Sequence, residues 1–181
     1  MKTLKKLFTL YIFLSIFTFS CMMVEDAEFS ELDDNNNNRI DIEEFVGYYT
    51  YGGHRLKEEK ELDVEGFYNY VFEIWDSNDD NKIDRNEWEF GNNYFLNRNY
   101  NLANFNDSDL NKDKYLSYDE FQKTMKGSGI FTSWDTDHDN MLNRVEMAQG
   151  VFLNWDADNS GYIVESEYKR FRNYFLGNQQ N

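Results

Sequence analysis

The chain has 181 residues, enough for one compact domain or two small lobes. Its formal charge is −16, from 18 basic and 34 acidic residues, which disfavours binding to nucleic acid or to anionic lipid. Such acidity is typical of disordered chains, but 18% of the residues are aromatic, so something must neutralise the carboxylates while the aromatic side chains pack.

The first segment has the pattern of an export signal. Lys2, Lys5 and Lys6 precede an uncharged run from Leu7 to Val24 that is rich in Leu, Phe and Ile. Because the lysines stay on the cytoplasmic side, we expect the acidic remainder of the chain to cross the membrane and become extracytoplasmic.

Three forms of this signal are compatible with the sequence. Thr18-Phe19-Ser20-Cys21 resembles a relaxed bacterial lipobox, in which Cys21 would be the lipidated first residue of a lipid-anchored protein. That motif prefers Leu at the place of Thr18 and a small residue at the place of Phe19. The alternatives are an ordinary cleaved signal of a secreted protein and an uncleaved membrane anchor. We assign residues 1–20 to the signal and 21–28 to a short linker.

The rest of the chain contains five repeats of twelve residues that align without gaps: 33–44, 76–87, 109–120, 135–146 and 156–167. Every repeat begins with Asp and ends with Glu. A phenylalanine stands four residues before each of them: Phe29, Phe72, Phe105, Phe131 and Phe152. Position 8 is always aliphatic: Ile40, Ile83, Leu116, Leu142 and Ile163. The residue after each repeat is apolar: Phe45, Trp88, Phe121, Met147 and Tyr168. One Asp/Asn-rich stretch would indicate only a surface turn, but five copies in fixed register exclude that reading.

These repeats resemble the calcium-binding loop of EF-hand proteins, D-x-[DN]-x-[DN]-G-x5-E. Calcium takes six to eight hard oxygens, which such a loop supplies from side chains at positions 1, 3, 5 and 12 and from the carbonyl at position 7. The resemblance implies the ligands Asp33, Asn35, Asn37, Arg39 and Glu44 in loop one; Asp76, Asn78, Asp80, Lys82 and Glu87 in loop two; Asp109, Asn111, Asp113, Tyr115 and Glu120 in loop three; Asp135, Asp137, Asp139, Met141 and Glu146 in loop four; and Asp156, Asp158, Ser160, Tyr162 and Glu167 in loop five.

The repeats depart from the family pattern at position 6, where a sharp turn normally requires glycine. Only loop five keeps it, as Gly161, while asparagine fills the position in loops one, two and four. Loop three has Lys114, which we expect to strain the turn and to weaken the site. We also expect reduced affinity in loop one, where Asn35 and Asn37 carry no charge, and high affinity in loop four.

Helical spacing of apolar residues between the loops predicts an all-α fold of helix–loop–helix units over residues 29–177, with short β-bridges between paired loops and a polar tail at 178–181. One stripe contains Val64, Phe67, Val71 and Ile74. Residues 143–155 leave room for a single helix, so loops four and five should lie at its opposite ends and not pair. Gly127-Ser128-Gly129 indicates a turn.

We therefore predict that loop one pairs with loop two and loop three with loop four, leaving loop five unpaired. An odd number of hands resembles the penta-EF-hand group, and that resemblance implies a homodimer formed through the fifth hand.

The function that the sequence supports is extracytoplasmic calcium binding, with structural ions and an unidentified protein or surface partner. A calcium-responsive regulator is an alternative, although few methionines lie in the folded part to line an adaptable groove. An enzyme is a further alternative that we do not favour: we find no nucleophile–base arrangement, and His54 and His138 are expected to be surface residues.

Overall fold

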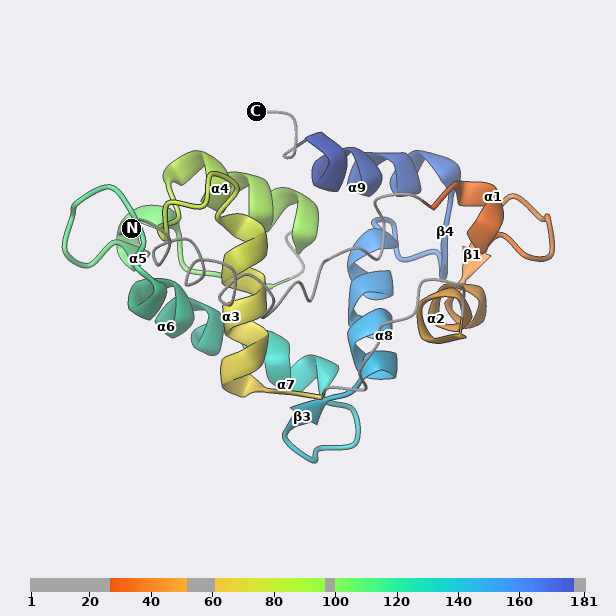
Figure 1. Ribbon diagram of the computed structural model, residues 1–181, viewed down its shortest axis with the longest axis horizontal. Coiled ribbons are helices and arrows are strands. Elements are labelled where there is room, and N and C mark those ends of the chain that lie inside the picture. Colours follow the sequence, from red (N-terminus) through yellow and green to blue (C-terminus); the bar gives the residue numbers. More distant parts are fainter. Residues whose placement is uncertain (1–26, 52–60, 97–99, 178–181) are drawn as a thin grey trace, which may run out of the picture.

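The computed structural model describes residues 27–51, 61–96 and 100–177 (Figure 1). The predicted export signal with Cys21, the residue His54 and the tail at 178–181 lie outside these ranges. Within them, none of the helices combines the length and the apolar character needed to span a bilayer.

The protein is mostly helical, with short strands. Its helices are α1 (Phe29–Leu32), α2 (Ile42–Tyr51), α3 (Val64–Trp75), α4 (Arg85–Phe90), α5 (Phe105–Ser108), α6 (Tyr118–Ser128), α7 (Ile130–Trp134), α8 (Arg144–Trp155) and α9 (Glu165–Gly177), with the π-helical segment η1 (Gly91–Phe95) after α4. The strands are β1 (Ile40–Asp41), β2 (Leu62–Asp63), β3 (Met141–Leu142) and β4 (Tyr162–Ile163). A single helix, α8, joins loops four and five, as the sequence predicts.

Each loop is entered from a helix that ends in the same way. The backbone N–H of the first aspartate donates to the carbonyl of the phenylalanine four residues earlier, at 2.9–3.0 Å in all five repeats. This is the last helical hydrogen bond before the chain turns into the loop. The repeated phenylalanine thus marks the final turn of the entering helix.

The helices that leave the loops begin at side-chain caps. Asp84, Ser117 and Asn143, each at loop position 9, form capping boxes with the closing glutamate three residues later. Further along, α6 ends at Gly129, which takes a left-handed φ of 72° that favours glycine, and α7 follows directly. The predicted turn thus lies at Gly129, while Gly127 and Ser128 belong to the last turn of α6.

The predicted pairing of loops is wrong. Strand β1 of loop one pairs with β4 of loop five, in the register Ile40 to Ile163. Ile83 of loop two and Leu116 of loop three exchange both backbone hydrogen bonds, at 3.0 and 2.8 Å. Strand β3 of loop four pairs with β2, which belongs to none of the five repeats. Loop five is therefore paired within the chain, and the reason for expecting a dimer through it falls away.

This arrangement brings distant parts of the chain together. Figure 1 shows α1 and β1 beside β4 and α9 on one side, loops two and three on the opposite side, and loop four below α7. The guanidinium of Arg170 on α9 donates to the carbonyl of Asn93 in η1 at 3.2 Å, a contact between the two sides.

Two buried clusters form the core. The first joins α3, α4, α6 and α7, and includes Phe67, Trp75 and Phe121; the second joins α2, α8 and α9, and includes Phe45, Trp155 and Phe171. Helix α8 contributes to both, through Met147 in the first and Phe152 in the second. The predicted stripe on α3 is buried at Phe67 and Val71, but Val64 is 38% exposed because it lies in the first turn, at the edge of the core.

Candidate metal-binding loops

Every loop buries the carboxylate at its first position. Asp33, Asp76, Asp109, Asp135 and Asp156 are only 4–8% exposed. In each, Oδ2 accepts the backbone N–H of position 6, at 2.7–3.1 Å. A buried anion of this kind needs a compensating positive charge, and the partners that the structure gives it here are backbone N–H groups.

The closing glutamates bridge the two ends of each loop. One oxygen of Glu146 accepts N–H groups from Thr136 and Asp137, and the other accepts the N–H of Asn143. Glu44, Glu87, Glu120 and Glu167 make the corresponding bonds in their own loops. The side chain therefore reaches across the loop from the leaving helix, which is the placement that lets both oxygens face a central ion.

The side chains at positions 3 and 5 lie at the exposed face of the loops. Asn78, Asn111, Asp137 and Asp158 each accept the N–H two residues later, at 2.9–3.2 Å. These bonds are local turns between a side chain and the backbone two residues later, and they wind the chain into a tight loop.

The backbone turns are left-handed at two places in every loop. Position 6 has φ between 62° and 86°, which confirms the turn predicted there and includes Lys114 at 74°. Position 4 is also left-handed, at Asn36, Asp79, Lys112, His138 and Asn159. The sequence analysis missed this second turn because only the preference of this conformation for Asn, Asp and His signals it, and Lys112 breaks that preference.

Loops four and five gather the densest sets of acidic oxygens. Carboxylate oxygens of Asp135, Asp137 and Asp139 lie within 4.8 Å of one another, as do those of Asp156, Asp158 and Glu167. In loop four, Oδ1 of Asp135 is also buried and has no hydrogen-bond partner among the described residues. A hard divalent cation is the ligand that fits an orphaned carboxylate oxygen facing two further carboxylates.

Burial and hydrogen bonding act differently on the carboxylates of different loops. Burial raises the pKa of Asp76 and Glu87 in loop two from their ordinary values. Burial also acts to raise the pKa of Glu120 and Glu146, but hydrogen bonds, from Ser117 to the first and from Asn143 and Thr136 to the second, outweigh it and lower both values. Loops three and four thus keep their closing glutamates ionised more readily than loop two.

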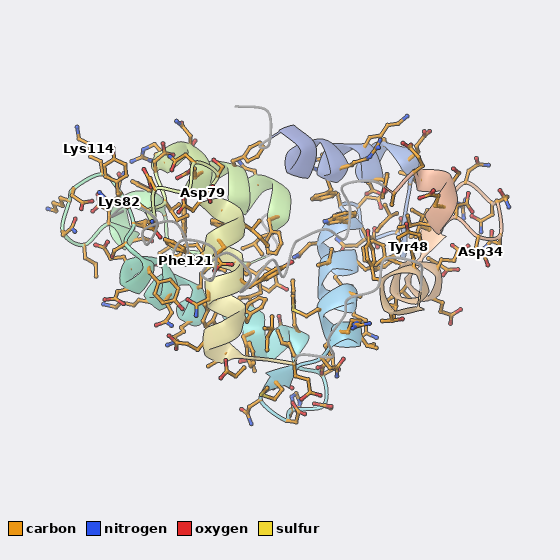
Figure 2. All side chains as sticks on the ribbon, viewed as in Figure 1. Asp34, Tyr48, Asp79, Lys82, Lys114 and Phe121 are labelled. Atoms are coloured by element: carbon orange, nitrogen blue, oxygen red, sulfur yellow. The ribbon has the colours of Figure 1, made fainter. Side chains whose placement is uncertain are left out.

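The residues at position 7, whose carbonyls are predicted ligands, also contact each other across the paired loops through their side chains. The guanidinium of Arg39 in loop one lies 4.3 Å from the ring centroid of Tyr162 in loop five. The ammonium of Lys82 in loop two lies 4.9 Å from the ring of Tyr115 in loop three. These cation–π contacts support the observed pairing, and the sequence alone could not show which residues meet. Figure 2 shows Lys82 and Lys114 together on one side and Asp34 on the opposite side.

Two tryptophans fix the helices around their loops. Trp75 and Trp134 stand directly before the first ligands of loops two and four, and each packs against a glycine four residues after the closing glutamate. A Cβ on Gly91 would lie 2.2 Å from the Trp75 ring, and one on Gly150 would lie 2.1 Å from the Trp134 ring. In loop five the equivalent pair is Trp155 stacked on Phe171, with centroids 5.2 Å apart. Each pair therefore sets the distance between the entering and leaving helices.

Comparison with known proteins supports this geometry at the first loop. Residues 24–46 match the family model described as EF hand. A search of curated proteins found no match to the chain. The match at the first loop and the mostly helical fold are consistent with an EF-hand-like fold, and the acidic clusters of loops four and five fit a metal ion such as calcium.

Proposed function

We propose that this is an extracytoplasmic protein that binds calcium in all five loops, and that its ions are structural. The observation that carries the proposal is the buried aspartate that opens each loop, 8% exposed or less, facing a closing glutamate that spans the same loop. Because the same anionic arrangement occurs five times, five bound cations account for it better than five isolated salt bridges would.

The charge of the whole chain supports the same reading. At −16 the chain repels itself, and five divalent ions would offset about ten of these negative charges. Extracellular EF-hand modules work at dissociation constants of about 10⁻⁴ to 10⁻³ M. Loops of that affinity would stay largely filled with calcium outside the cytosol. A permanently filled site cannot report a signal.

The methionines favour the structural role over the regulatory one. A sensor exposes an adaptable methionine-rich groove, but here Met125 is fully buried and Met147 is 6% exposed, both within the aromatic core. We therefore propose that calcium closes this core and presents a fixed surface to a protein or surface polymer. This proposal assigns the loop carboxylates to calcium and not to acid–base catalysis.

Export by the N-terminal segment, with or without a lipid on Cys21, belongs to this proposal. Mass analysis of the mature protein from an expressing bacterial host tests it. An N-terminal diacylglyceryl-cysteine supports the lipoprotein form, a free N-terminus near residue 21 supports secretion, and an intact N-terminus in the cytosolic fraction would contradict export.

A calcium titration separates the structural from the regulatory role. Far-ultraviolet circular dichroism and tryptophan fluorescence follow folding, while a dye reports exposed apolar surface. We expect helix content to rise with calcium and dye binding to fall. An apo protein that is already fully folded, and whose dye binding rises with calcium, would contradict the structural role.

A further inference from the structure

The partner of loop four has the register of an EF-hand loop. Leu62 of β2 lies opposite Leu142, and Asp63 lies opposite Met141. In the pair formed by loops one and five, Ile40 at position 8 lies opposite Ile163 at position 8, and Asp41 at position 9 lies opposite Tyr162 at position 7. The two registers coincide if Leu62 stands at position 8 and Asp63 at position 9 of a further loop.

The hydrogen bonds around β2 agree with this numbering. The carboxylate of Asp63 accepts the backbone N–H of Gly66 at 2.8 Å and caps helix α3. In loops one and two, the aspartate at position 9 accepts the N–H of position 12 in the same way, at 2.9 Å. Gly66 thus occupies the place of a closing glutamate.

The packing residues follow the same register. Phe67, directly after this place, is fully buried, as are Phe45 and Phe121 at the equivalent places after loops one and three. Counting back from Leu62 puts position 1 at residue 55, and Tyr51, the last described residue of α2, takes the place of the repeated phenylalanine four residues earlier. Residues 55 and 76 are then separated by the same interval as the first positions of loops four and five, at 135 and 156, because each pair flanks a single helix.

We infer that α2, β2 and α3 belong to a further hand, which holds no metal and serves as the structural partner of loop four. This inference rests on the proposed calcium binding at loop four. The sequence of 55–66 (RLKEEKELDVEG) places Arg55 and Lys57 at positions 1 and 3 and Gly66 at position 12, so the hand lacks two of the side-chain oxygen ligands of a calcium loop and its bidentate closing glutamate.

The metal-free hand is the second of six along the chain, and the hands pair in a nested order. The first (loop one) pairs with the sixth (loop five), the second with the fifth (loop four), and the third (loop two) with the fourth (loop three). Each half of the chain contributes one hand to every pair. Two pairs join two calcium loops, and the middle pair joins a calcium loop to the metal-free hand. Loop four therefore gains its β-bridge without needing a second ion to order its partner.

A site-resolved titration of the Leu62→Ala variant tests this inference. The backbone amides at position 6 (Asn38, Asn81, Lys114, Asn140 and Gly161) bond to the first ligand of their own loops, so their NMR shifts report calcium at each site separately. We expect Leu62→Ala to raise the calcium midpoint of Asn140 at least threefold and to leave those of Asn38 and Gly161 within twofold. Ile40→Ala is the matched control, because it removes the equivalent β-bridge side chain from the pair of loops one and five. It should show the reverse pattern.

An unchanged Asn140 midpoint in Leu62→Ala, or equal changes at all five amides, would overturn the inference. The unmodified protein provides a test that does not depend on this variant folding: nuclear Overhauser contacts between the backbones of Leu62 and Leu142 are expected, and their absence would contradict the pairing. A bound sixth calcium would contradict the metal-free assignment. If no position-6 amide moves with calcium while the Leu62–Leu142 contacts are present, the proposed function fails and the pairing of hands stands.

Discussion

At the residue scale, every loop has left-handed backbone at positions 4 and 6 and a buried carboxylate at position 1. A non-glycine residue in the left-handed region costs free energy, of the order of 1–2 kcal/mol, because its Cβ crowds the following carbonyl. Lys114, at φ 74°, has neither the hydrogen-bonding side chain of asparagine nor the freedom of glycine. An ion that binds the loop must hold this turn in place.

Replacing Lys114 with glycine should therefore tighten loop three. We expect Lys114→Gly to lower the calcium midpoint of this loop about threefold to fivefold, a gain of about 1 kcal/mol from relief of strain. The NMR shift of the residue-114 amide measures it. Lys114→Ala is the control, because it removes the charge and keeps the Cβ. An equal gain in both variants would show that charge, and not backbone strain, limits this site.

The buried tyrosines should make the fold sensitive to alkaline pH. Burial raises the pKa of Tyr68 to about 12, from an ordinary value of 10. Because the folded protein binds this proton more tightly than the unfolded chain, the stabilisation is complete below pH 10 and is lost as the pH rises toward 12. Ultraviolet titration at calcium saturation should show a tyrosine that ionises only above pH 11. Its ionisation near pH 10 in the folded protein, with the other tyrosines, would contradict the buried placement.

At the element scale, much of the architecture could be predicted, but the pairing of loops could not. The repeated phenylalanine, the aliphatic residue at position 8 and the closing glutamate are local signals, and the short interval between loops four and five predicts the single helix, α8, that the structure has there. Pairing depends on which loops the shared helices bring together, which is a non-local property. Residues 55–66, which include β2, have neither an aspartate at position 1 nor a glutamate at position 12, so the loop motif does not match them.

The packing of tryptophan on glycine could not be predicted either, because the sequence does not show which side chain contacts a glycine within a helix. We expect Gly150→Ala to destabilise the protein by about 1–3 kcal/mol, since its Cβ would overlap the Trp134 ring, and to weaken loop four. Urea unfolding at saturating calcium measures the loss. Gly127→Ala on α6 is the control: nothing lies within 4 Å of its added Cβ, so it should be neutral or stabilising by up to about 1 kcal/mol. Equal effects of the two substitutions would contradict the role of the tryptophan contact.

The contact between loops one and five gives a further prediction at this scale. Ile163→Ala in loop five should raise the calcium midpoint of loop one as well, because its side chain lies opposite Ile40 in the shared β-bridge. The Asn38 amide reports this effect, with Asn81 of loop two as the internal reference. A shift confined to Gly161 would show that the two loops bind independently.

At the scale of the whole molecule, the fold sets an acidic surface around two aromatic cores that share helix α8. The cores stabilise the compact state, and the charge of −16 opposes it. In this account bound calcium decides the balance, since it neutralises carboxylates that are already buried at the start of each loop. Chelation should therefore expand the protein, and added monovalent salt should reverse that expansion only in part, because it screens exposed charges more than buried ones.

The number of calcium ions bound per chain shows whether all five loops are metal sites. Native mass spectrometry of the purified protein, equilibrated with millimolar calcium, should show five ions, and Glu146→Gln should show four under conditions where loop four alone is weakened. A chain that takes up no calcium at this concentration, and keeps the same compactness with a chelator, would contradict the account.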